Sequence, residues 1–219
     1  MPQVDFSFYL VTDRHQTHAR PLLDVIHAAV RAGVRAIQLR EKDLATRPLA
    51  ALACDVSALV RASGGRMFVN DRLDVCWASQ SSGVQLPASG LPIPVARTLL
   101  GPAKFVAVSA HSAAEAAQAE AQGADFVVLG PLFDTPSKRS FGSPIGLKEL
   151  ERARKVCRIP LFGIGGITAE RVPDVIRAGA HGVAVIGAVM SAPDVEAAAR
   201  GFLTALEGLT PTEVDGADC

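Results

Sequence analysis

The alternation of short apolar runs with longer helical runs constrains the fold of this chain more than any other feature. Runs typical of β-strands lie at 8–12, 34–39, 66–70, 83–86, 104–109, 125–130, 159–164 and 181–186. Runs with helical spacing follow each of them, at 20–33, 46–63, 71–79, 91–100, 112–123, 146–156, 168–179 and 192–208. Several of the strands are apolar throughout, as the VVL run at 127–129 shows, which is typical of parallel strands covered on both faces.

Repeated strand–helix units build either an open doubly wound sheet or a closed barrel. Eight units in a chain of 219 residues favour the barrel. The glycine fingerprint of a dinucleotide-binding sheet is missing after the first strand, where residues 12–15 read TDRH. We therefore predict an α/β fold, a (β/α)8 TIM barrel, in one domain over residues 1–209, followed by a flexible polar tail at 210–219.

Composition excludes several classes of function. Lysine and arginine together number 22, and aspartate and glutamate also number 22, so the chain lacks the basic excess of a nucleic-acid binder. It has no apolar run long enough to span a membrane and no secretion signal at its start, and its four cysteines form no CxxC pair. We expect a cytoplasmic protein that acts on small molecules, with neither nucleic acid nor a membrane as a partner.

In a barrel, functional side chains gather on the loops that leave the carboxyl ends of the strands. Gln38, Arg40 and Lys42 follow the second strand, and two cations with an amide suit a phosphate or pyrophosphate. The alternative is a solvated turn in which Arg40 pairs with its neighbour Glu41. Asn70 and Asp71 end the third strand, where they can hold Mg²⁺ or cap the next helix.

Further candidates follow the fifth and sixth strands. Ser109 ends the fifth strand and can donate a hydrogen bond to a ligand. Thr135, Ser137 and Lys138 lie in the helix-free stretch 130–145, which is either a functional loop that closes over an anion or simply a basic, mobile loop.

Glycine turns follow the seventh and eighth strands. Backbone N–H groups at such turns and at the helix starts beyond them favour a phosphate, and barrels commonly bind phosphate there. We therefore predict two anion sites on one mouth, the first built from Arg40, Lys42 and Lys138, and the second from the amides of Gly165, Gly166, Ile186 and Gly187.

The motifs QLREK, FVNDRLDV, GVQL, VSAH, GPLFDTPSK, GIGGI and GVAVIGAV occur in the order and spacing of the thiamine phosphate synthase superfamily. The chain resembles this superfamily over about residues 8–206. The resemblance implies a transferase of thiamine biosynthesis on a TIM barrel. Such an enzyme joins 4-amino-2-methyl-5-hydroxymethylpyrimidine diphosphate to a thiazole phosphate and releases pyrophosphate, with Mg²⁺ assisting the leaving group.

The resemblance also assigns roles to residues. It implies that Arg40, Lys42, Ser109 and Lys138 are catalytic and that Asp71 is a metal ligand. It implies that the substrates are bound by Gln38, Arg40, Lys42, Asn70, Ser109, Thr135, Ser137, Lys138, Gly166, Ile186 and Gly187.

Three departures from the synthase pattern leave other functions open. The loop after the fourth strand usually reads HLGQED, and Gly90 replaces the aspartate that would be the second Mg²⁺ ligand. The QLP run at 85–87 resembles the thiazole tautomerase branch, although Pro131 stands where that branch has a catalytic histidine. Gly187 replaces the usual serine. The alternatives are a tautomerase-like paralogue, a non-catalytic barrel that binds phosphate ligands, and a generic phosphosugar isomerase or aldolase, for which no well-placed acid–base pair or Schiff-base lysine is present. No oligomeric state is predicted.

Overall fold

The eight strands close into one parallel barrel. The computed structural model describes residues 2–135 and 143–209, so the predicted tail at 210–219 lies outside it. The strands pair in sequence order and β8 pairs with β1, which confirms the predicted TIM barrel. The strands are β1 (Phe8–Val11), β2 (Ala36–Leu39), β3 (Arg66–Asn70), β4 (Gly83–Leu86), β5 (Phe105–Ala110), β6 (Phe126–Leu129), β7 (Leu161–Ile164) and β8 (Gly182–Val185).

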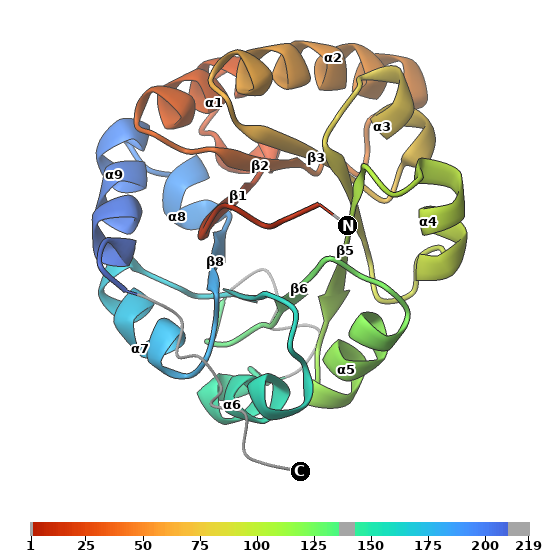
Figure 1. The fold of residues 1–219 in the computed structure, drawn as a ribbon. Coiled ribbons are helices and arrows are strands. Elements are labelled where there is room, and N and C mark those ends of the chain that lie inside the picture. Colours follow the sequence, from red (N-terminus) through yellow and green to blue (C-terminus); the bar gives the residue numbers. More distant parts are fainter. Residues whose placement is uncertain (1, 136–142, 210–219) are drawn as a thin grey trace.

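The helices form an outer ring around the strands, except for the short α8, which lies inside α9 next to β8 (Figure 1). They are α1 (Leu22–Arg31), α2 (Thr46–Ala62), α3 (Leu73–Ala78), α4 (Ile93–Leu100), α5 (Ala113–Ala121), α6 (Gly146–Val156), α7 (Val172–Arg177), α8 (Gly187–Met190) and α9 (Val195–Leu206). Short 3₁₀ turns, η1 (Arg14–Gln16) and η3 (Ala169–Arg171), precede α1 and α7. Within the described chain, no helix is long and apolar enough to cross a membrane.

Aromatic side chains fill the barrel near the end where the strands begin. Tyr9, Phe68, Phe126 and Phe162 point inward from four strands and are completely buried. The ring centroids of Tyr9 and Phe68 lie 5.3 Å apart, and those of Phe126 and Phe162 also lie 5.3 Å apart. Each such pair contributes about 1 kcal/mol beyond the burial of its area. Because these rings leave no open channel there, ligands are expected at the other end of the barrel.

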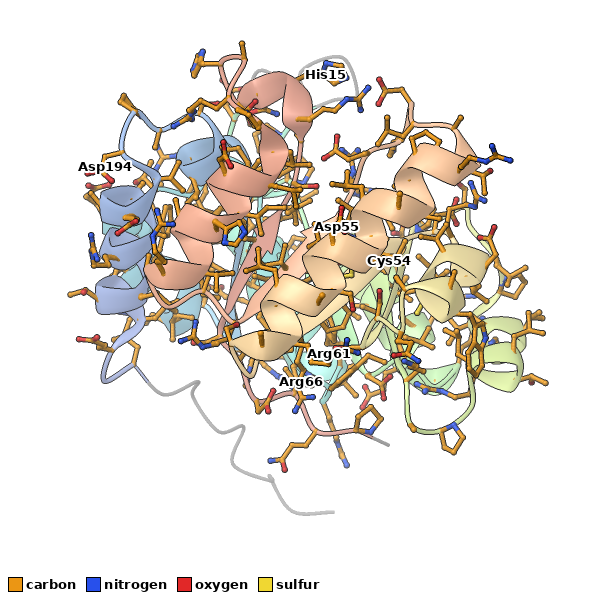
Figure 2. All side chains as sticks on the ribbon, turned by 90° about the horizontal axis from the view of Figure 1, so that it is seen from above. His15, Cys54, Asp55, Arg61, Arg66 and Asp194 are labelled. Carbon is orange, nitrogen blue, oxygen red and sulfur yellow. The ribbon has the colours of Figure 1, made fainter. Side chains whose placement is uncertain are left out.

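The segment before β1 covers the end of the barrel where the strands begin. It crosses the middle of the ring in Figure 1, where Phe6 packs against the aromatic rings. Arg66 holds this segment with two hydrogen bonds to Asp5, at 2.7 and 2.5 Å. Figure 2 shows Arg66 at one end of the molecule and His15 at the other. The open mouth is therefore the end that carries His15.

Helix starts differ from the sequence-based expectation at several places. Ser112 caps α5 as its sequence predicts, because its Oγ accepts a 3.2 Å hydrogen bond from the N–H of Glu115. The prediction that Thr168 caps a helix at 168–179 is confirmed in position only. Thr168 is the N-cap residue of the 3₁₀ turn η3, which precedes α7, and its hydroxyl bonds to the Glu170 side chain instead of making a cap hydrogen bond. The short helix α8 was not predicted, because four residues are too few to show a helical period.

A partly buried ion pair at the base joins α4 to the residue before β6, and its removal is expected to destabilise the barrel. The carboxylate of Asp125, 1% exposed, lies 2.5 Å from the Arg97 guanidinium and accepts a 2.7 Å bond from the N–H of Val106. Asp125→Asn leaves Arg97 without its counter-charge, so we expect the unfolding free energy to fall by about 3 kcal/mol. Urea unfolding measures this. The matched control is Asp174→Asn, an exposed i,i+3 partner of Arg177, for which less than about 1 kcal/mol is expected. Equal losses in the two variants would contradict the account.

Candidate active site

A cluster of charges gathers where β2 and β3 end. The positive charge of Arg40 is the main reason why the pKa of Lys42 lies below its ordinary value, with loss of solvent second, and Asp71 acts in the opposite direction. The structure therefore brings Arg40, Lys42 and Asp71 together at the mouth. In the described structure the carboxylate of Glu41 bonds to Thr12 and Arg14, so the alternative in which Arg40 pairs with Glu41 at the surface is wrong.

Two buried amides face the barrel interior below this cluster. The Nε2 of Gln38 and the Oε1 of Gln85 are buried and meet no hydrogen-bond partner among the described residues. The other amide atom of Gln85, Nε2, donates to Ser109 Oγ at 3.0 Å. A buried polar group without a partner costs about 1–3 kcal/mol. This cost is recovered if a ligand offers one acceptor to Gln38 and one donor to Gln85.

Sequence reasoning did not assign Gln85 to the site. The signal in the sequence was a polar residue inside the apolar run at 83–86. The structure adds the strand register: Gln85 pairs with Asn70 on β3 and with Ala107 on β5, and Ser109 lies two residues further along β5. Side chains in register or two residues apart share one face of a sheet. Asn70, Gln85 and Ser109 therefore line the same inner face near the mouth.

Asp71 adopts a left-handed backbone conformation with φ at +64°. Its N–H donates to the carbonyl of Gln85 at 2.9 Å, and helix α3 has Arg72 as its N-cap. The alternative role of Asp71 as a helix cap is therefore wrong. Aspartate tolerates this region better than most residues, and the turn places its charge beside Lys42 and Arg72.

The residues at this edge fit a magnesium ion that is shared with a ligand, rather than one held by the protein alone. Among the described residues, no group of three or more His, Cys, Asp or Glu side chains is placed so that it could hold a metal ion. Gly90 closes a tight turn in which its N–H donates to the Pro87 carbonyl, and a Cβ at position 90 would lie 2.8 Å from Pro87 Cδ. Asp71 thus stands as one carboxylate, and Mg²⁺ commonly takes one or two carboxylates plus phosphate oxygens and water.

The turn after β7 is built so that only glycine fits it. Gly165 and Gly166 have φ of +99° and +63°. A Cβ on Gly165 would lie 2.6 Å from Pro131 Cβ, and one on Gly166 would lie 2.5 Å from the carbonyl oxygen of Asp134. Arg171 secures the outer side, since it donates to the Gly166 carbonyl at 2.7 Å and lies 4.5 Å from the Phe133 ring centroid.

A second glycine turn leads from β8 into α8. The helix begins at Gly187, so the N–H groups of Gly187 and Ala188 precede the hydrogen bonds from Val189 and Met190 back to Ile186. Such unsatisfied N–H groups favour an anion. The turns after β7 and β8 are neighbours on the rim because these strands pair.

The end of the Gln16 side chain lies where a side chain at position 187 would go. Its Nε2 donates to Asp13 at 2.7 Å, and its Oε1 would lie only 2.6 Å from a Cβ on Gly187. We expect Gly187→Ser to cost about 1 kcal/mol of stability, because the obstacle is the end of a flexible side chain. Gln16→Ala in the same chain should remove that cost. Thermal unfolding of the single and double variants measures the coupling, and an equal loss from Gly187→Ser in both backgrounds would refute it.

The remaining sequence candidates divide into two groups. Thr135 is half-buried at the end of the first described range. Ser137 and Lys138 lie outside the described residues, so their predicted contact with an anion stays a prediction.

The described parts of the two predicted anion sites lie on separate parts of one rim. Arg40 and Lys42 follow β2, whereas the glycine turns follow β7 and β8, and β1 separates β8 from β2 in the closed ring. Fold and site together define a (β/α)8-barrel enzyme whose polar and glycine-rich loops gather on one rim.

The chain belongs to the thiamine monophosphate synthase family, whose model matches residues 8–189. It is 46% identical over 200 residues to the thiamine-phosphate synthase of Moorella thermoacetica, covering 91% of this chain and 94% of that one. It is 45% identical over 192 residues to the thiamine-phosphate synthase of Roseiflexus castenholzii, covering 88% and 84%. The thiamine phosphate pyrophosphorylase structure from Pyrococcus furiosus superposes with a TM-score of 0.85 at 33% identity, covering 93% and 96%.

Proposed function

We propose that this protein is a thiamine-phosphate synthase. It joins 4-amino-2-methyl-5-hydroxymethylpyrimidine diphosphate to a thiazole phosphate and releases pyrophosphate. The proposal is supported by membership of this family, together with charged residues after β2 and β3 and glycine turns after β7 and β8 on the same rim. Two phosphorylated reactants need two such groups, with their reacting carbon and nitrogen held between them.

The cations after β2 serve the leaving group. When the bond between the pyrimidine methylene carbon and the diphosphate oxygen breaks, its electron pair stays on the diphosphate and a pyrimidine methyl cation forms. Arg40 and Lys42 stabilise the charge on those oxygens. The sequence motif assigns the same role to Lys138. The ring nitrogen of the thiazole then donates its lone pair to the methylene carbon. No protein nucleophile takes part.

The buried amides bind the pyrimidine. An aminopyrimidine carries ring-nitrogen acceptors beside an amino donor, which matches the Nε2 of Gln38 and the Oε1 of Gln85, two of the buried atoms that lack partners in the described structure. Ser109, held by Gln85, lies on the same face near the mouth. Asn70 ends β3 above this pair and binds the same substrate.

Asp71, together with diphosphate oxygens and water, would hold Mg²⁺, which neutralises charge on the leaving group. The turn at Gly165–Gly166, with Thr135, Ser137 and the N–H groups at Ile186 and Gly187, binds the phosphate of the thiazole. The relatives reported above are named as synthases, so the tautomerase alternative is not favoured.

The test is an assay of the purified protein with both substrates, with and without Mg²⁺, in which thiamine phosphate and pyrophosphate are quantified. We expect equal amounts of the two products, formed faster when Mg²⁺ is present. A thiazole isomerisation assay runs beside it. Isomerisation without any thiamine phosphate would overturn the proposal in favour of the tautomerase, and substrate binding without either product would favour the non-catalytic barrel.

A further inference from the structure

We propose that Glu41 is a positioning residue that holds Arg40 and Lys42 toward the mouth; this inference rests on the proposed function of that site. The Glu41 side chain is 1% exposed although it lies between two cationic neighbours in the chain. A charged side chain is rarely buried so completely unless it is paired and hydrogen-bonded.

Glu41 joins the loops after β1 and β2. Its Oε1 accepts a 2.6 Å hydrogen bond from the hydroxyl of Thr12, and its Oε2 accepts from the N–H of Arg14 at 3.1 Å and from the Arg14 guanidinium at 3.2 Å. The same Thr12 hydroxyl accepts a 3.0 Å hydrogen bond from the N–H of Arg40. The backbone of Arg40 is thereby tied to the buried carboxylate through one hydroxyl.

The next acidic residue repeats the arrangement. The two carboxylate oxygens of Asp43 accept hydrogen bonds from the two terminal nitrogens of Arg14, each at 2.5 Å. Glu41 and Asp43 are thus both bonded to Arg14. The alternating residues Arg40 and Lys42 remain free of these two acids and face the mouth. This alternation resolves the charge pattern REKD into a bonded set and a ligand-facing set.

Arg40 and Lys42 repel each other, because both are positively charged, and the charge of Arg40 lowers the pKa of Lys42. Without a ligand anion between them, two flexible cations on a free loop would move apart into solvent. The Glu41 contacts oppose that movement. The free energy needed to hold the two cations close together is therefore supplied by folding and does not weaken anion binding.

Charge alone and positioning predict opposite signs for the loss of this carboxylate. Removing a negative charge near an anion site strengthens anion binding by simple electrostatics. Releasing the loop weakens anion binding, because the cations are no longer held in place. The sign of the change therefore decides between the two effects.

The experiment is titration calorimetry of inorganic pyrophosphate into wild-type protein and Glu41→Gln. We expect about tenfold weaker binding in Glu41→Gln. Where the synthase assay gives turnover, the KM for the pyrimidine diphosphate should rise with little change in the KM for the thiazole phosphate. Asp125→Asn is the matched control, because it removes an equally buried, arginine-paired carboxylate at the opposite end of the barrel. It should bind pyrophosphate within about twofold of wild type.

If Glu41→Gln does not fold, Thr12→Val decides the question, because it keeps the carboxylate and removes the hydroxyl that links it to Arg40. Several-fold weaker pyrophosphate binding by Thr12→Val would support the inference. Unchanged or tighter binding by a folded variant, or equal weakening by Asp125→Asn, would overturn it. A wild-type protein that binds pyrophosphate but forms no thiamine phosphate would contradict the proposed function alone. The role of Glu41 would still be decided by whether Glu41→Gln weakens or strengthens pyrophosphate binding.

Discussion

Arg40→Ala is expected to lower kcat/KM for thiamine phosphate formation at least tenfold. One preorganised donor to a developing negative charge is worth about 10²–10³ in rate, and the charge here develops on diphosphate oxygens that Arg40 and Lys42 share. Loss of Arg40 also removes the main cause of the lowered pKa of Lys42, so that pKa should rise toward its ordinary value. Steady-state rates with each substrate varied in turn measure the effect.

Two further variants sharpen this prediction. Arg40→Lys keeps the charge but loses the planar fork of donors, so its rate should fall between wild type and Arg40→Ala. Arg152→Ala removes a highly exposed arginine from α6 and should leave the rate unchanged. Wild-type kinetics in Arg40→Ala would remove this side chain from the site.

Gly165→Ala is expected to raise the KM for the thiazole phosphate at least tenfold. Its φ of +99° lies outside the left-handed helical region that other residues tolerate, which costs about 1–3 kcal/mol. The added Cβ would lie 2.7 Å from the backbone Cα of Pro131, so the loops after β6 and β7 must separate. The N–H groups of the turn then no longer converge on one phosphate. Kinetics at saturating pyrimidine diphosphate measure this.

Gly64→Ala is the matched control for that substitution. Gly64 also has a positive φ, +74°, but a Cβ there meets no atom within 4 Å, and the residue lies between α2 and β3 at the base. It should cost about 1 kcal/mol of stability and leave both KM values unchanged. If Gly165→Ala changes only stability, as Gly64→Ala does, the Gly165–Gly166 turn does not hold the phosphate.

The barrel and the position of its mouth could be predicted from the sequence because both depend on local patterns. The alternation of apolar strands with helices fixes the fold class, and strand ends locate the polar rim. Arg40, Lys42 and Asp71 stand out because charged residues directly follow apolar strands. The helix α8 was not predicted because Gly187–Met190 is too short to show a helical period in hydrophobicity.

Other parts of the site depend on contacts that no local pattern records. The burial of Glu41 depends on Thr12 and Arg14, about thirty residues earlier in the chain. The unpartnered amide atoms of Gln38 and Gln85 appear only once the barrel closes around them. The same is true of Gln16, whose Oε1 lies where a side chain at position 187 would go.

Simultaneous binding of two anions tests the central claim most directly. In titration calorimetry, thiazole phosphate is added to protein already saturated with pyrophosphate. The structure predicts that one equivalent still binds, with an affinity within a few-fold of that for the free protein. It also predicts that Arg40→Ala weakens pyrophosphate binding more than thiazole phosphate binding, and that Gly165→Ala has the opposite preference. Displacement of one ligand by the other would show that the rim holds a single anion site and would contradict the account.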